Sequence, residues 1–225
     1  MSLYFKVLLF SFIIPFIFSF HKKIKFYKFF KQMAGTLLLT SFFFIIWDVY
    51  FTKIGVWGFD KTYHSSIMLS NLPLEEVLFF FVIPFICVFT YFVFLEHKVF
   101  NLNVNTKFLK LICCILIILA FLFYNNAYTI SVLTLTTLIL FYIIFYKPKW
   151  IGYFFSMYII VHIFPFLLVN GILTGYITEL PPVWYDNNNI IGVRLGTIPL
   201  EDFLYSFILL FLNTSLFEYL RKKTT

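Results

Sequence analysis

Long apolar runs alternate with short polar segments along the whole chain. Seven of these runs are candidates for membrane-spanning helices, since a span needs roughly 20 apolar residues. The fourth run is short, and the polar stretch YNNAY after it is typical of a tight turn between two helices. The pattern predicts an all-α polytopic membrane protein with seven transmembrane helices, at about residues 3–20, 33–52, 74–95, 108–124, 127–146, 150–169 and 200–219.

Basic residues collect in every second connection between these predicted helices. Because lysine and arginine favour the cytoplasmic side, the N-terminus is expected outside and the C-terminus in the cytoplasm. No small-residue cleavage site follows the first apolar run, so we expect this run to be retained as a helix. The basic residues that follow the first, third, fifth and seventh helices are Lys22, Lys23, Lys25, Lys28, Lys31, Lys98, Lys107, Lys110, Lys147, Lys149, Arg221, Lys222 and Lys223.

Composition excludes a soluble domain. The 225 residues are 62% hydrophobic and 12% charged, with a mean hydropathy of +0.94, and a soluble fold of this length has no room to bury so much apolar surface. The basic residues behind the net charge of +7 lie between apolar segments. This arrangement fits a membrane surface and gives no reason to expect a nucleic-acid partner. Cys87, Cys113 and Cys114 lie inside apolar runs and have no disulfide-framework or metal-ligand spacing.

One short motif occurs twice. PLEE at residues 73–76 returns as PLED at 199–202, an offset of 126 residues, and each copy opens a predicted helix. A loop with a tryptophan and an acid precedes each copy, GVWGFD in the first case and VWYD in the second. The helix before each loop ends near a polar residue, Asp48 in the first half and Asn170 in the second.

This repetition predicts a duplicated three-helix unit. Three crossings leave the chain on the wrong side of the membrane, so a fourth helix is needed before the second unit can start in the same direction. We therefore expect two parallel three-helix repeats, residues 1–100 and 127–225, joined by a linker helix within 101–126. Both acid motifs then lie at one depth near the outer face, with a site between the units.

The paired acids have a structural and a functional interpretation. Proline and acids suit the first turn of any helix, because acids there complement the helix dipole. Two copies at equivalent depth favour a functional role, since ionisable residues at membrane depth are costly. Neighbours on a helix point about 100° apart, so Glu75 and Glu76 cannot both face one point, and the same holds for Glu201 and Asp202. General acid and base work divided between the acids is the chemistry that this pattern favours.

Other chemistries find little support. The sequence has no Asp-rich diphosphate motif, no glycine-rich nucleotide fingerprint and no lysine in the seventh span for a retinal Schiff base. His64 is either a proton acceptor near the first motif or a plain loop residue. Arg194 either tunes the second pair of acids or is an interfacial cation. No metal-ligand spacing is found among His21, His64, His97 and His162, so no metal site is expected.

Three stretches carry a resemblance to a known family. WDVYFTKIGVWGFD, the following LPLEEVLFF, and GVRLGTIPLEDFLYSFILLFLN resemble the lycopene cyclases of carotenoid biosynthesis, of the heterodimeric and fused type. The resemblance covers nearly the whole chain and is strongest at residues 47–82 and 192–213. It implies a bacterial fusion of two small three-helix units in the inner, cytoplasmic membrane.

The resemblance implies a lycopene beta-cyclase, an isomerase-type intramolecular lyase. Lycopene or a related acyclic carotenoid would be protonated at a terminal double bond, the carbocation would close a six-membered ring, and loss of a proton would leave a β-ring. The expected partners are this substrate, the lipid bilayer and other carotenoid-pathway enzymes. No cofactor is expected, because the isomerisation is not a redox reaction. By carry-over the catalytic residues are Glu75, Glu76, Glu201 and Asp202, supported by Asp48, Asn170, Arg194 and Trp57.

Two alternatives stay open. One is a membrane protein that binds carotenoids or other isoprenoids without catalysis, or a relative of the same fold that acts on another polyene. The other is a proton-coupled transporter, since parallel repeats and intramembrane acids suit that function too. A transporter is expected to place its acids near the midplane of the bilayer, whereas these acids open their helices.

Overall fold

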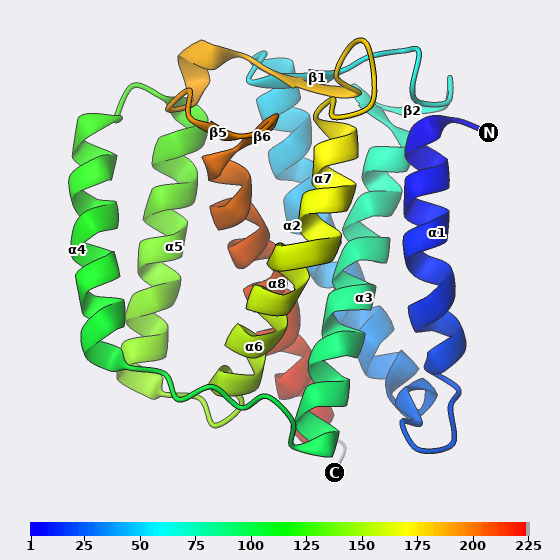
Figure 1. Cartoon of the computed structure of the whole chain (residues 1–225), viewed down its shortest axis with the longest axis vertical. Coiled ribbons are helices and arrows are strands. Elements are labelled where there is room, and N and C mark those ends of the chain that lie inside the picture. Colours follow the sequence, from blue (N-terminus) through cyan, green and yellow to red (C-terminus); the bar gives the residue numbers. More distant parts are fainter. Residues whose placement is uncertain (224–225) are drawn as a thin grey trace.

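Upright helices make up most of the computed structural model, which describes residues 1–223, and short strands gather at one end of them (Figure 1). The N-terminus lies at the strand end and the C-terminal helix finishes at the opposite end. The α-helices are α1 (Leu3–Phe18), α2 (Phe30–Lys53), α3 (Leu74–His97), α4 (Thr106–Leu122), α5 (Ala127–Tyr146), α6 (Ile151–Val161), α7 (Leu167–Leu173) and α8 (Leu200–Lys222).

Shorter elements connect these helices. A 3-10 turn, η1 (Phe26–Phe29), leads into α2, and a π-helical segment, η2 (His162–Phe166), makes α6 and α7 one continuous helical stretch. A further 3-10 turn is η3 (Asn187–Asn189). The strands are β1 (Trp57–Phe59), β2 (Met68–Leu69), β3 (Leu72–Pro73), β4 (Val183–Tyr185), β5 (Arg194–Leu195) and β6 (Ile198–Pro199).

Five helical stretches within the described residues are long and apolar enough to cross a bilayer. They include α3, α5 and α8, together with α2 joined to η1 and the continuous α6–η2–α7 stretch. The chain is therefore an integral membrane protein. Helix α1 has 16 residues and α4 has 17, so both are shorter than these five.

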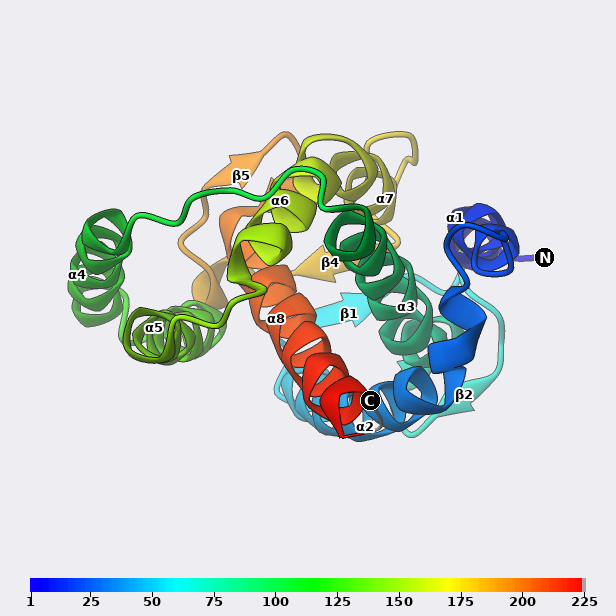
Figure 2. The ribbon, with the colours of Figure 1, turned by 90° about the horizontal axis from the view of Figure 1, so that it is seen from below.

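Helices α3 and α8 form the centre of the bundle. Both pack against α2 and against α6, and they also contact each other. Helix α1 covers α3, while α5 covers α8 and carries α4 on its outer side (Figure 2). The core between these helices is aromatic: Phe80, Phe92 and Phe217 are almost completely buried.

Polar side chains hold the central helices together. Thr40 of α2 donates a hydrogen bond to Asn213 of α8 at 2.8 Å, and Ser41 donates to the carbonyl of Phe80 in α3. His162 and Ser206 form a further hydrogen bond between η2 and α8. Such bonds matter in a membrane, where lipid tails remove most of the hydrophobic drive for helices to associate.

The strands cover the end of the bundle at which α3 and α8 begin. Strands β1 and β4 pair in antiparallel fashion, with Gly58 opposite Trp184, so the two long loops cross at this point. A side chain at Gly58 would collide with the Trp184 indole, which explains a glycine here. Two hairpins, β2–β3 and β5–β6, then lead directly into α3 and α8.

The hairpins end where the two sequence motifs begin. Pro73 and Pro199 are extended residues that stand immediately before the first residues of α3 and α8, with ψ angles of 148° and 143°. A proline suits this place because it lacks the amide hydrogen that would be left unpaired there. The prediction that each motif opens a helix is thus confirmed.

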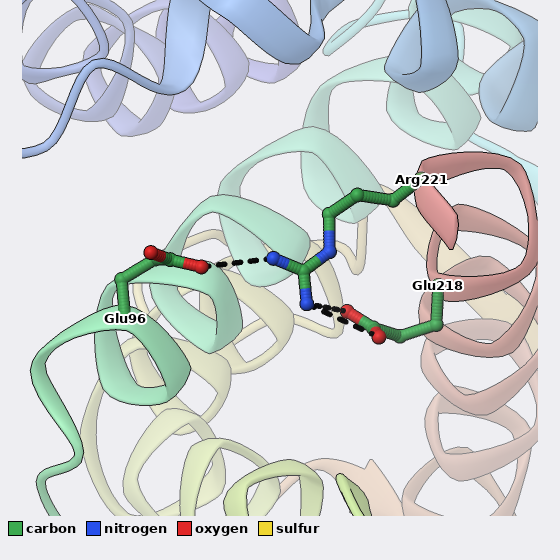
Figure 3. A network of polar contacts seen from close by, with 3 residues as sticks. All are labelled: Glu96, Glu218 and Arg221. Atoms are coloured by element: carbon green, nitrogen blue, oxygen red, sulfur yellow. Dashed lines mark hydrogen bonds and ion pairs between the residues drawn. The ribbon is translucent and has the colours of Figure 1, made fainter. Parts of the chain in front are cut away.

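At the opposite end of the bundle, Arg221 of α8 links two carboxylates. Its guanidinium lies 2.8 Å from Glu96 of α3 and 3.0 Å from Glu218, one turn earlier in α8 (Figure 3). The Glu218 side chain is only 3% exposed, whereas that of Glu96 is 46% exposed. Arg221 therefore both joins α3 to α8 and compensates a buried negative charge.

We predict that Arg221→Met lowers the thermal unfolding midpoint of the purified protein in detergent. The loss should correspond to roughly 1–3 kcal/mol, below the cost of breaking a fully buried pair because Arg221 is partly exposed. Adding Glu218→Leu should recover most of the loss, because the uncompensated buried charge is then gone. As a matched control, Glu96→Gln alone should change little. An unchanged midpoint for Arg221→Met, or no recovery in the double variant, would contradict this role.

Candidate active site

The first acid of each motif ties its helix to the loop before it. Glu75 accepts hydrogen bonds from the Ser2 hydroxyl at 2.6 Å and from the Ser65 amide at 2.7 Å. Glu201 accepts from the Thr129 hydroxyl and from the Ile191 amide, both at 2.6 Å. In both cases one donor lies near the start of a neighbouring helix, and the other lies ten residues before the acid.

The second acid of each motif turns to the interior of the bundle. Glu76 accepts a hydrogen bond from the Tyr4 hydroxyl of α1 at 2.5 Å. Asp202 accepts three: from Tyr128 of α5 at 2.9 Å, from Asn170 of α7 at 2.8 Å and from Tyr185 of β4 at 3.0 Å. The two acids are therefore held in similar ways, but Asp202 has three donors where Glu76 has one.

One cavity of about 580 Å³ receives both of these second acids. Glu76 and Asp202 line it, while Glu75 and Glu201 do not, which is what the 100° step between helical neighbours predicts. Of the other residues singled out in the sequence, Asp48, Asn170 and Trp57 also line the cavity, and Arg194 does not.

Asp48 is the third carboxyl group of this cavity. It lies near the end of α2, is 2% exposed, and accepts a hydrogen bond on Oδ1 from the Trp57 indole. Its Oδ2 is buried and has no hydrogen-bond partner among the described residues. Asn170, the residue that the sequence pattern pairs with Asp48, instead donates its amide to Asp202, so the two residues play different parts in the site.

Four aromatic side chains surround the acids. The Trp57 ring lies 5.0 Å from that of Tyr128 and 6.1 Å from that of Tyr185, between ring centroids, and Tyr205 lies within 6.4 Å of Trp57. All four line the cavity. Aromatic faces carry partial negative charge and attract cations, so this part of the cavity suits a positively charged carbon centre.

Tyr185 and Arg194 belong to the connecting loops beside the second motif. Desolvation and the neighbouring Asp202 carboxylate raise the pKa of Tyr185 well above its ordinary value, which keeps the phenol neutral and able to donate. Arg194 donates to the carbonyl of Thr197 at 2.9 Å, and its guanidinium lies 5.7 Å from the centre of the Tyr185 ring. Arg194 thus contacts the Tyr185 ring but does not line the cavity itself.

His64 lies outside the cavity. Its Nδ1 is 2.6 Å from the carbonyl oxygen of Ser65, the residue that also binds Glu75. Within residues 1–223, no group of three or more His, Cys, Asp or Glu side chains has an arrangement that could hold a metal ion.

Sequence reasoning missed the hydroxyl groups that bind the acids. Tyr4 and Tyr128 lie 124 residues apart, close to the 126-residue offset of the motifs, and each stands in the first turn of a helix. Ser2 and Thr129 flank them and bind the first acid of each motif. These hydroxyl residues lie in the short stretches SLYF and AYTI. The likeness between the two stretches is too slight to recognise until the acids that they bind are known.

Equivalent contacts recur throughout the strand end at the offset of the motifs. The Asp60 amide donates to the Pro182 carbonyl, and the Asp186 amide donates to the Val56 carbonyl, each at 2.9 Å. Likewise, the Leu74 amide donates to Ile67 and the Leu200 amide to Val193. Adding 126 to the residue numbers of the second bond pair, Leu74 with Ile67, gives Leu200 with Val193. In the first bond pair the halves exchange partners: Asp60 and Asp186 are 126 residues apart, and so are Val56 and Pro182.

Comparison with known families identifies the chain at the level of its family. A family model described as lycopene cyclase matches residues 1–94 and 125–220, which is most of the sequence. No curated protein and no solved structure gives a significant match. This match shows that the chain belongs to the lycopene cyclase family, and the buried acids that line an aromatic cavity agree with it.

Proposed function

We propose that the protein is a lycopene beta-cyclase that closes β-rings at the ends of lycopene within the cavity between α3 and α8. The family supports cyclisation of a carotenoid. The observation that carries the finer proposal is that Glu76 and Asp202, the buried second acids of two related motifs, line one cavity beside the aromatic side chains Trp57, Tyr128, Tyr185 and Tyr205. Acid, base and cation stabilisation are the three requirements of this reaction.

Glu76 is proposed as the proton donor. It is 9% exposed, and Tyr4 is its one hydroxyl partner within residues 1–223. Two more acids, Asp48 and Asp202, line the same cavity. Like charges in an apolar site repel, so a proton is retained among these three groups. Transfer of that proton from Glu76 to one carbon of the terminal double bond leaves a carbocation on the other carbon and a carboxylate on Glu76.

The aromatic side chains then stabilise the cation while the ring closes. A neighbouring double bond of the same polyene supplies the electron pair for the new carbon–carbon bond, and the positive charge moves into the ring. The side chains of Trp57, Tyr128, Tyr185 and Tyr205 line the cavity, and aromatic rings attract such a charge. Water must be excluded at this stage because it would add to the cation and give an alcohol. The apolar side chains that line most of the cavity disfavour water.

Asp202 is proposed as the group that takes the proton from the ring. Three donors hold its carboxylate, so it stays in place as a fixed negative charge facing the cation. Removing a proton beside the cationic carbon forms the ring double bond. The proton then returns to Glu76, because the reaction consumes none overall. Asp48, which lines the same cavity, is proposed as the carrier between the two acids.

The first acids, Glu75 and Glu201, are proposed to hold the scaffold. Each binds a hydroxyl group from a neighbouring helix and an amide of the preceding loop, outside the cavity. By fixing the loop against the helix start, each one sets the position of the acid next to it. They are thus proposed as positioning residues, although the sequence motif alone makes all four acids equal candidates.

We also propose the repeat architecture expected from the sequence. In this arrangement, residues 1–100 and 127–225 form two parallel three-helix units, and residues 101–126 hold the linker helix. The recurrence of contacts at a 126-residue offset supports it, as does a family match that leaves out residues 95–124. Helices α1 and α4 would complete seven spans, because their 16 and 17 residues rise about 24 and 26 Å.

We propose the orientation in the membrane from the distribution of basic residues. Lysines are frequent in the connections after α1, α3 and α5 and at the end of α8, all at the end of the bundle opposite the strands (Figure 1). This supports a cytoplasmic position for the end opposite the strands. The strand end, with the acids, would then lie near the outer face of the bacterial inner membrane, with the N-terminus outside.

Expression in lycopene-producing bacteria tests the activity. We expect the pigment to shift from lycopene to a monocyclic or bicyclic carotene with β-rings, as measured by chromatography of cell extracts. Cells that carry the empty vector are the control. Unchanged lycopene in cells whose membranes contain the protein would favour a carotenoid-binding protein or a transporter over a cyclase.

Isosteric variants test the division of labour between the acids. Glu76→Gln and Asp202→Asn should each reduce cyclisation at least about 100-fold, the scale of a general acid or base. Glu75→Gln and Glu201→Gln should retain most of the activity but lower the thermal unfolding midpoint. These four variants change one acid each and keep its shape. The assignment is wrong if the first pair stays active, or if the second pair loses activity while the protein stays folded.

A further inference from the structure

The cavity is elongated along the helices. On α3 its lining residues run from Glu76 to Thr90, which is about 21 Å along the helix axis. On α1 they run from Tyr4 to Pro15, and on α8 from Asp202 to Leu210. We call this elongated space the slot. It extends through a large part of the roughly 30 Å thickness of a bilayer's hydrocarbon core.

All the carboxyl groups that line the slot are at one of its ends. Asp48 lies near the end of α2, and Glu76 and Asp202 lie in the first turns of α3 and α8, so all three are at the strand end. The other end is lined by side chains such as Thr90 and Leu210, with no acid among the lining residues. Proton chemistry is therefore confined to one end of the slot.

The slot opens sideways between two rims. One rim is on α1, where Phe10 and Ile14 line the slot although they are 68% and 65% exposed. The other is on η2 and α7, where Phe164 and Leu168 line it at 73% and 55% exposed. Side chains that line a cavity and are also this exposed mark its boundary with the surroundings, which are lipid at this depth.

The opening lies at the depth of the hydrocarbon core. Ile14 is ten residues after Tyr4 on α1, or about 15 Å from the acid end. Nearer the acids the gap between the rims is closed by a small apolar cluster of Tyr4, Leu8, Leu173 and Val183. Helix α3 lies behind the opening, beside α1 on one side and α6 on the other (Figure 2).

We propose that a linear polyene enters the slot sideways from the bilayer, between α1 and the η2–α7 stretch, with one end at the carboxyl groups. The rest of the chain lies along the slot and out into the lipid. Since the far end of a stiff polyene cannot fold back to the acids, each ring is formed in a separate binding event. This inference rests on the proposed cyclase function and adds to it the route of access and the number of rings formed per encounter.

Narrowing the opening tests the route. The double variant Ile14→Trp/Leu168→Trp places large side chains on both rims, where the exposure of the native residues leaves room for them. We expect the rate of lycopene conversion in lipid vesicles to fall about tenfold, the scale on which changes in pocket volume act. Ile118→Trp/Leu38→Trp is the matched control, because these residues are similarly exposed, at 58% and 64%, and do not line the slot.

A binding measurement separates access from chemistry. In the inactive Glu76→Gln background, lycopene that stays with the purified protein is measured from its absorption. The rim double variant should retain less lycopene than the control double variant, which should retain as much as the Glu76→Gln protein itself. Full conversion and full retention in the rim variant would overturn the route while leaving the cyclase function intact. Absence of conversion by the unmodified protein would instead overturn the function itself.

Product analysis tests the separate binding events. With lycopene in large molar excess over the unmodified protein in vesicles, the monocyclic product should exceed the amount of protein before bicyclic product becomes the main species. A product that is bicyclic from the start, with monocyclic carotene never above the amount of protein, would show that both ends react without release and would contradict the proposal.

Discussion

Carboxyl groups buried at the start of apolar helices are the constraint on which the rest of this structure depends. An acid taken out of water is costly unless hydrogen-bond donors replace the lost solvent. Every acid of the two motifs has such donors, and they come from other elements: hydroxyl groups near the starts of α1 and α5, and amides of the connecting loops. The acids therefore fix how the surrounding helices and loops are placed around α3 and α8.

The two halves of the site use the same plan with a few different side chains. A tyrosine from a covering helix binds the second acid in each half, Tyr4 with Glu76 and Tyr128 with Asp202. Asn170 then adds an amide donor to Asp202, whereas the first half contributes an acid, Asp48, whose Oδ2 has no hydrogen-bond partner among the described residues. This difference is what allows two similar motifs to be proposed as acid and base.

The same bundle also explains how an apolar substrate and proton chemistry can meet. The acids lie at the strand end, where β1 and β4 cross above the cavity and bring Trp57 and Tyr185 to its edge. The remaining length of the cavity is lined mainly by apolar side chains of α1, α3 and η2–α7. A hydrocarbon chain can thus remain in a lipid-like environment while only its end reaches the polar groups.

The sequence by itself determined the helical membrane class, the five long spans, the placement of both motifs at helix starts and the family resemblance. These features depend on local patterns, namely the length of the apolar runs, proline and acids at the helix start, and the spacing of the motifs. It also indicated that neighbouring acids must point in different directions, since helical geometry is local. Only the tertiary structure decided which acid of each pair faces the cavity and which donors each acid has. Tyr4, Tyr185 and Asn170 reach the acids from distant parts of the chain, and such contacts arise from helix packing and loop crossing, which leave no periodic trace in the sequence.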